Sequence, residues 1–180
     1  MPDSTPIRGV ILDAGGTLIA EESSEKRTSA PLLPGVRRVL PSLAKRYRLA
    51  LLANSDTATR EVVTADLARR GILKYFHAVM TSSDIGWRKP HPSAFDAAVR
   101  SLGLKREETV MVGNKLEIDV AGGKAAGLRT IHLASSPRDR SVPKSALEEP
   151  SITIHSFKEL PNALRRLVDL PVPARTADVR

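Results

Sequence analysis

Asp13 stands in the segment VILDAGGTL, directly after an apolar run and just before Gly15 and Gly16. A carboxylate in such a place can attack phosphorus and form an acyl phosphate, and the two glycines would let the backbone come close to a phosphoryl group. The same oxygens suit Mg²⁺, which prefers carboxylate, carbonyl and water ligands. The alternative is an aspartate at a strand end that only caps a turn. We therefore take Asp13 as a candidate nucleophile and metal ligand.

Two further segments offer an amide and an ammonium group. Asn54 ends the apolar run LLAN, where its amide could donate a hydrogen bond to a phosphoryl oxygen. The sequence Asn-Ser-Asp is also ordinary turn and helix-cap chemistry. Lys89 precedes Pro90, which favours an extended backbone at the lysine, and a fixed ammonium there could neutralise a nucleophile and a transferring phosphoryl group. An ordinary surface lysine is the alternative.

A second carboxylate comes from the segment VMVGNKLEIDVAGGKAAG. Asn114 follows a predicted strand and its glycine turn, and Asp119 lies near the start of a predicted helix. Two aspartates that face one another repel unless a cation lies between them. Asp119 could instead only stabilise the N-terminus of that helix. The pattern favours a divalent cation held jointly by Asp13 and Asp119.

Short apolar runs that end in small or polar residues predict strands buried on both faces, as in a parallel sheet. The predicted strands are 7–12, 48–53, 78–81, 109–112, 130–133 and, at the edge, 152–154. Helical patterns alternate with them at 35–46, 57–70, 92–102, 117–126 and 157–167. This order predicts a single-domain α/β fold, a Rossmann-like, doubly wound parallel sheet. Ligands bind such sheets at the carboxyl ends of the strands, where Asp13, Asn54 and Asn114 are expected.

The composition limits the remaining possibilities. The length of 180 residues suits one domain, predicted over 7–170, with flexible termini at 1–6 and 171–180. The absence of cysteine excludes disulfides, thiolate catalysis and cysteine-based zinc sites, and it fits a cytoplasmic location. We expect no signal peptide or membrane span, because the N-terminal apolar run soon reaches an aspartate and two glycines. The net charge of +8 raises the question of a nucleic-acid partner, although basic pairs spread over predicted helices favour solvated helix faces.

The order of the four segments resembles the haloacid dehalogenase superfamily from about Ile7 to Leu133. The resemblance implies a Mg²⁺-dependent phosphatase in which Asp13 is the nucleophile and Lys89 stabilises the developing charge. It also implies a metal site and a phosphoryl site. The implied metal ligands are Asp13, the Gly15 carbonyl, Asp119 and Asn114, and the implied phosphoryl contacts are Asn54, Lys89 and Gly16.

The chain departs from the pattern of that superfamily at three positions. Gly15 replaces a second aspartate that serves as general acid and base, Ala53 replaces a serine or threonine, and Asn114 replaces an acidic residue. One interpretation is a slow or specialised phosphatase that uses a good leaving group or another acid, for which Asp56, Glu21 and Glu22 are candidates. The other is a relative that binds metal or phosphate without turnover. Cleavage of carbon–halogen or carbon–phosphorus bonds is less favoured, because those relatives depend on a cap domain.

The spacing of the motifs indicates whether the chain has room for a cap domain. Sixteen residues separate Thr17 from Pro34, which suffices for a hairpin flap but not for a helical cap. The 34 residues between Asn54 and Lys89 are needed for a helix, a strand and their loops. The sequence therefore predicts a capless member of the superfamily. Such members act on large phosphorylated substrates or complete their site by homo-oligomerisation.

Overall fold

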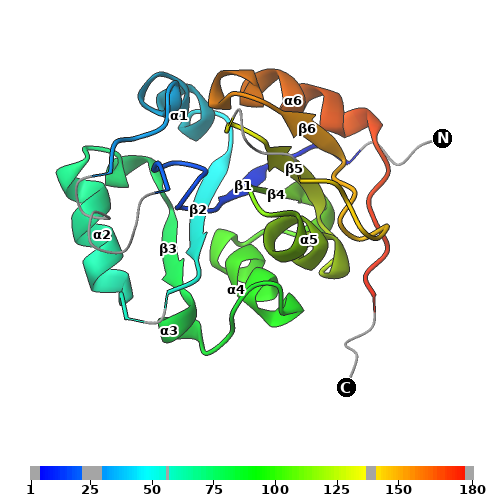
Figure 1. Cartoon of the computed structure of the whole chain (residues 1–180), viewed down its shortest axis with the longest axis horizontal. Helices are drawn as coiled ribbons and strands as arrows, with labels where there is room; N and C mark the ends of the chain where they lie inside the picture. Colours follow the sequence, from blue (N-terminus) through cyan, green and yellow to red (C-terminus); the bar gives the residue numbers. More distant parts are fainter. Residues whose placement is uncertain (1–4, 22–29, 56, 137–140, 177–180) are drawn as a thin grey trace.

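The computed structural model describes residues 5–21, 30–55, 57–136 and 141–176. Its centre is a six-stranded sheet in the order β3-β2-β1-β4-β5-β6 (Figure 1), and every neighbouring pair is parallel. This confirms the predicted parallel α/β fold. The strands are β1 (Gly9–Leu12), β2 (Arg48–Ala53), β3 (Ala78–Thr81), β4 (Thr109–Gly113), β5 (Arg129–Leu133) and β6 (Ile152–Ile154).

The strand order reverses beside β1, which lies between β2 and β4. The chain runs outward from β1 through β2 to β3 and then returns to β4 on the other side. Leu12 at the end of β1 pairs with Val112 in β4, so the residues that follow these two strands meet at one edge. Doubly wound sheets bind ligands at such a reversal, and Asp13 and Gly113 both lie there.

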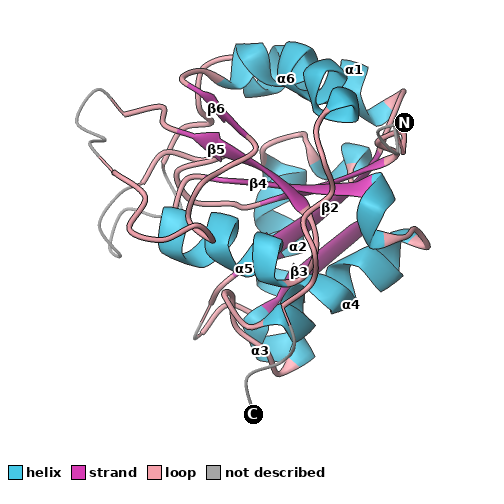
Figure 2. Ribbon diagram, turned by 90° about the vertical axis from the view of Figure 1, so that its right-hand side faces the viewer, coloured by secondary structure: helices cyan, strands magenta, loops and turns pink. Residues whose placement is uncertain are grey.

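Helices cover both faces of the sheet (Figure 2). Helices α1, α2 and α6 contribute to the larger apolar cluster, and α4 contributes to the smaller one on the opposite face, which α5 also covers. Helix α1 shows why its sequence folds this way: Val36, Val39, Leu40 and Leu43 recur at the spacing of one helical face, and all four are buried. The helices are α1 (Val36–Ala44), α2 (Arg60–Arg69), α3 (Ser82–Ile85), α4 (Pro92–Leu102), α5 (Ala121–Ala125) and α6 (Leu160–Arg166). None of those described has the length and apolar character that a membrane crossing requires.

The observed elements follow the predicted ones closely, although α2 and α6 each begin three residues later than expected. Strand β1 begins at Gly9, two residues later than expected. The predicted helix at 117–126 is divided into a π-helical turn, η4 (Leu116–Val120), and the short helix α5. The helical turn α3 lies in a segment for which the sequence predicts no helix. Short 3-10 turns add to the connections at η2 (Leu73–Tyr75), η3 (Arg106–Glu108), η5 (Phe157–Glu159) and η6 (Leu167–Asp169).

The segment after β1 forms two short antiparallel arms. Ile19 pairs with Leu32, and the Ala20 N–H donates to the Pro31 carbonyl at 2.9 Å. These arms agree with a hairpin flap, but residues 22–29 between them, including Glu22, lie outside the described residues. The size of the cap therefore stays a prediction.

The described part of the predicted flexible C-terminal tail contacts α4 and α5, and its flexibility stays a prediction. Arg175 Nη2 lies 3.0 Å from Asp96 Oδ2, and the Thr176 N–H donates to the Ala125 carbonyl at 3.2 Å. Asp96 is buried and also pairs with Arg106. A buried carboxylate needs counter-charges, and the tail provides one of them.

Arg129 holds the two ends of the described chain together. Its guanidinium is buried and donates to the backbone carbonyls of Leu167 and Thr5 at 2.8 Å each and to that of Glu107 at 2.5 Å. Burial lowers the pKa of this guanidinium. Thr5 lies within the predicted flexible N-terminus and makes this contact, and the flexibility of residues 1–6 stays a prediction.

Replacing Arg129 by methionine is expected to lower the free energy of unfolding by about 3 kcal/mol, because three buried or partly buried carbonyls lose their donor while one buried charge is removed. Urea denaturation measures this change. Arg38→Met on the exposed side of α1 makes the same substitution and should change the free energy by less than about 0.5 kcal/mol. Equal stability of the two variants would show that the Arg129 contacts make no net contribution to the free energy of unfolding.

Candidate functional site

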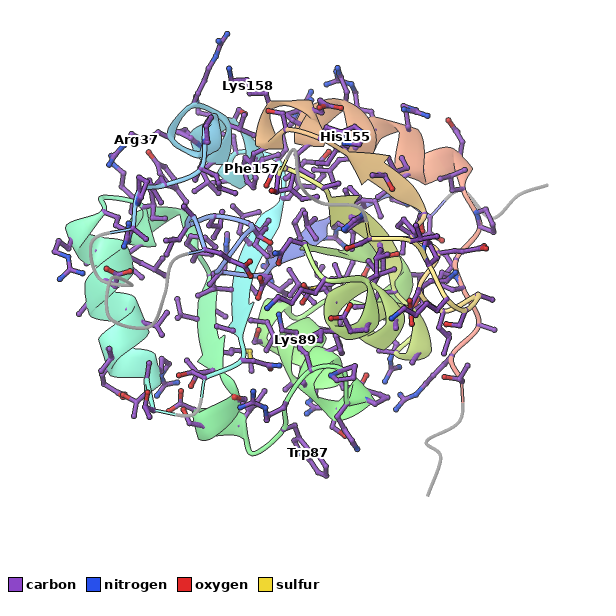
Figure 3. All side chains as sticks on the ribbon, in the orientation of Figure 1. Arg37, Trp87, Lys89, His155, Phe157 and Lys158 are labelled. Atoms are coloured by element: carbon purple, nitrogen blue, oxygen red, sulfur yellow. The ribbon has the colours of Figure 1, made fainter. Side chains whose placement is uncertain are left out.

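Lys89 joins two carboxylates at the edge where the strand order reverses. Its Nζ lies 2.6 Å from Asp13 Oδ1 and 2.6 Å from Asp119 Oδ1. The side chains of Lys89 and Asp119 are 2% and 1% exposed, and that of Asp13 is 13% exposed. Figure 3 shows Lys89 near the centre of the molecule. Three residues far apart in the sequence thus form one buried charged cluster, as the sequence predicted for these positions.

Local backbone structure brings the two aspartates together. Asp13 directly follows β1, and its N–H donates to the Val112 carbonyl of β4 at 3.0 Å. Asp119 lies in the π-helical turn η4, and its Oδ2 accepts from the Lys115 N–H at 3.1 Å. Gly113 is required here, because a Cβ at this position would lie 2.3 Å from the Asp119 carboxylate. The close approach of η4 to β4 therefore depends on the glycine that ends the strand.

The electrostatics of the cluster follow from burial and from these three charges. Burial raises the pKa of the Asp13 carboxyl to about 6, with Lys89 opposing the shift and Asp119 adding to it. Burial alone would lower the pKa of Lys89, but the two carboxylates outweigh it and the pKa is raised. Near neutral pH Asp13 is therefore ionised beside an ammonium group, the state that a carboxylate nucleophile requires.

Asn54 directs its amide at the backbone of Lys89. Its Nδ2 donates to the Lys89 carbonyl at 2.8 Å, and its Oδ1 accepts from the Lys89 N–H at 2.9 Å. Only one N–H of this amide remains for a phosphoryl oxygen. The predicted contact between Asn54 and a phosphoryl group stays a prediction, and the structure gives this side chain a second partner that the sequence did not indicate.

A family model described as haloacid dehalogenase-like hydrolase matches residues 16–133, which is more than half of the 180-residue chain. This stretch includes Lys89 and Asp119 and the strands β2 to β5. The chain belongs to the haloacid dehalogenase-like hydrolase family. The match begins three residues after Asp13 and contains the segments of Asn54, Lys89 and Asp119, so the resemblance to this family is confirmed.

Relatives and solved structures support the family assignment. The chain is 37% identical over 130 residues to glyceraldehyde 3-phosphate phosphatase of Methanopyrus kandleri, covering 72% of this chain and 56% of that protein. It is 36% identical over 143 residues to mouse N-acylneuraminate-9-phosphatase, covering 78% and 54%. An uncharacterized protein from Listeria monocytogenes serotype 4b has a similar structure, with a TM-score of 0.75 at 26% identity over 89% of this chain and 98% of that one. The chain spans about half the length of the curated relatives that it matches.

Within this haloacid dehalogenase-like site, Asn114 presents an oxygen that lacks a partner. Its Oδ1 is buried and has no hydrogen-bond partner in the described part of the chain. Its Nδ2 donates to Glu21 at 3.4 Å and packs against Gly16, where a Cβ would lie 2.1 Å away. Gly16 has a φ of 76°, a conformation that other residues rarely adopt. The glycine thus makes room for Asn114 at the rim of the site.

The residues present fit a hard divalent cation. The Asp13 and Asp119 carboxylates and the Lys89 ammonium carry a formal net charge of −1, and the unpartnered oxygen of Asn114 is a further ligand of the type that Mg²⁺ prefers. No group of three or more His, Asp or Glu side chains suited to a metal occurs in the described ranges. A site here would consequently need backbone, amide or water oxygens, as the sequence predicted for Gly15 and Asn114.

Several neighbouring residues bear on the predicted alternatives. Thr17 Oγ1 lies 3.4 Å from Asp13 Oδ2, a contact that the threonine after the glycine pair could have indicated. Ser55, two residues after Ala53, has a hydroxyl whose Oγ accepts from the Ala58 N–H at 2.7 Å. Among the candidate acids, Glu21 also lies 3.3 Å from the Lys115 ammonium. Asp56 and Glu22 lie outside the described residues.

Trp87 lies at the periphery, in contrast to Lys89 (Figure 3). Its ring stacks on His91 with centroids 4.2 Å apart, and the residue is 46% exposed. His91 also begins α4, because its Nδ1 accepts from the Ser93 N–H at 3.2 Å. The Trp87–His91 pair therefore packs across the loop that contains Lys89, on the outside of the molecule (Figure 3).

Proposed function

We propose that the chain is a Mg²⁺-dependent phosphatase that acts on a phosphate monoester through an aspartyl phosphate at Asp13. The observation that carries this proposal is the buried bridge of Lys89 between Asp13 and Asp119. The names of the two curated relatives support it, since both are phosphatases. The family membership supports the broader activity, hydrolysis.

In the proposed reaction an Asp13 carboxylate oxygen attacks phosphorus, and the bond from phosphorus to the leaving oxygen breaks. Lys89 remains within hydrogen-bond distance of the nucleophile and stabilises negative charge that shifts between it and the phosphoryl group. Water then hydrolyses the aspartyl phosphate, which releases phosphate and regenerates the carboxylate. The first step leaves an alkoxide that must gain a proton, and Gly15 offers no side chain to supply it.

Asp13, Asp119, Asn114 and the Gly15 carbonyl are the proposed ligands of Mg²⁺. When bound, the ion would neutralise the oxygens of the phosphoryl group as a Lewis acid. Lys89, Gly16 and the remaining N–H of Asn54 are the proposed phosphoryl contacts. The net negative charge of the three charged side chains favours the binding of a cation.

We also propose that the substrate is a bulky phosphorylated molecule and that the protein acts in the cytoplasm. The short described arms around residues 22–29 support an open, capless site, and an open site admits large substrates. A site left open by one chain could also be completed by a second copy. The cysteine-free sequence is compatible with a reducing compartment.

Hydrolysis of p-nitrophenyl phosphate with Mg²⁺ or with a chelator tests the proposed function. Removal of the metal is expected to lower kcat about 10²-fold, because a Lewis acid contributes several kcal/mol to the stabilisation of the transition state. Restoring Mg²⁺ should restore the rate. A catalytically silent relative, which Gly15, Ala53 and Asn114 would favour, predicts equal background rates under both conditions.

A further inference from the structure

We infer that Asn54 is a positioning residue, whose amide holds the backbone of Lys89 so that the ammonium reaches both carboxylates. The expected kinetic effect rests on the proposed function. The contacts between Asn54 and Lys89 that motivate the inference do not. Asn54 and Lys89 are 35 residues apart in sequence, and their contact is formed twice, once at the carbonyl and once at the N–H.

The paired hydrogen bonds fix the Lys89 peptide groups in orientation as well as in place. The amide donates to the carbonyl and accepts from the N–H of one and the same residue, much as a neighbouring strand would. A single hydrogen bond would leave rotation about its axis, whereas two opposed bonds remove it. Asn54 follows β2 directly, so the sheet itself determines where the Lys89 backbone lies.

The position of the Lys89 ammonium depends on a fixed backbone, because the side chain that carries it is flexible. Its long, flexible chain loses much conformational freedom when the ammonium is held in one place. Both Nζ contacts are 2.6 Å long, and the side chain is 2% exposed, so a shift of the backbone cannot be absorbed by moving the ammonium into water. In the described residues, both hydrogen bonds to the Lys89 backbone come from Asn54.

Ser82 provides a matched control for this contact. Its hydroxyl accepts from the Ser55 N–H at 2.9 Å and donates to the Ser55 carbonyl at 2.9 Å. It therefore makes the same kind of paired backbone contact, but to Ser55, the residue that follows Asn54, and it is also buried. Ser82→Ala loosens this loop without removing any contact to Lys89.

The kinetic test uses Asn54→Ala, Lys89→Met and the double variant in the hydrolysis of p-nitrophenyl phosphate. Asn54→Ala is expected to lower kcat about 10-fold with little change in KM, because misplacing a charge affects the transition state more than substrate binding. In the Lys89→Met background, Asn54→Ala should lower kcat by much less than in wild type, since only its proposed phosphoryl contact is left to lose. An equal loss in both backgrounds, or an equal loss in Ser82→Ala, would overturn the inference.

A second readout does not require catalysis. Acetylation of Lys89 by acetic anhydride, followed by peptide mass spectrometry, is expected to be about tenfold faster in Asn54→Ala than in wild type, because the segment opens more often. Ser82→Ala should leave the Lys89 rate near that of wild type. If the wild type shows no Mg²⁺-dependent hydrolysis, the proposed function fails while the labelling still decides the role of Asn54. Unchanged labelling in Asn54→Ala would contradict that role.

Discussion

Asp13→Asn is expected to lower kcat for p-nitrophenyl phosphate by at least about 10³-fold, since removing a covalent nucleophile leaves only binding and electrostatic effects. The amide keeps the shape of the side chain but has no negative oxygen for attack on phosphorus. Burial raises the pKa of the Asp13 carboxyl to about 6, so the buried charge is itself unfavourable for folding at neutral pH. The variant should for this reason remain folded, which thermal unfolding checks.

Asp66→Asn is the matched control for this substitution. Asp66 lies on α2 and pairs with Arg69 and Arg70, away from the cluster around Lys89. The same change of carboxylate to amide there should leave kcat within about twofold of wild type. If Asp13→Asn retained the wild-type rate, Asp13 could not be the nucleophile, and the aspartyl phosphate would have to be abandoned.

The carboxylate–lysine cluster was predictable because it depends on topology. Asp13 and Asp119 follow neighbouring strands of a sheet whose order is set by alternating strands and helices, and such ends meet at one edge. The sequence also places the six strands within two residues at each end, since their short apolar runs end in polar or glycine residues. The bounds of each strand depend on the residues of its own segment, so the sequence pattern predicts them.

Contacts between loops were not predictable in the same way. The hydrogen bonds between Asn54 and the Lys89 backbone depend on where the loop that contains Lys89 lies in space. The sequence Asn-Ser-Asp gives no signal that distinguishes a residue that makes this contact from one that does not. The π-helical turn at Leu116–Val120 was likewise missed. It packs closely against β4, where a Cβ at Gly113 would lie 2.3 Å from Asp119. The tail contact of Arg175 with Asp96 joins residues 79 positions apart. Such features depend on tertiary context, which overrides local preference.

Gly15→Asp is expected to raise kcat for an alkyl phosphate such as glycerol phosphate by about 10²- to 10⁴-fold, the usual contribution of a general acid. The side chain would donate a proton to the leaving alkoxide, the step for which Gly15 offers no group. The structure has space for it, since a Cβ at Gly15 meets no other atom within 4 Å and Gly15 is not among the glycines with positive φ. Kinetics with both substrates measure the change. The gain should be smaller for p-nitrophenyl phosphate, because nitrophenolate leaves readily without a proton.

Two control variants distinguish the effect of the added acid from the effect of the added side-chain volume. Gly15→Asn fills the same space without an ionisable group, and its rate should stay near that of wild type. Gly16→Asp places the same carboxylate one residue later, where the φ of 76° and a Cβ only 2.1 Å from the Asn114 amide predict destabilisation instead of a gain. Equal rates for Gly15→Asp and Gly15→Asn would mean that proton delivery does not limit the reaction. In that case a donor already present, or a leaving group that needs none, would account for turnover.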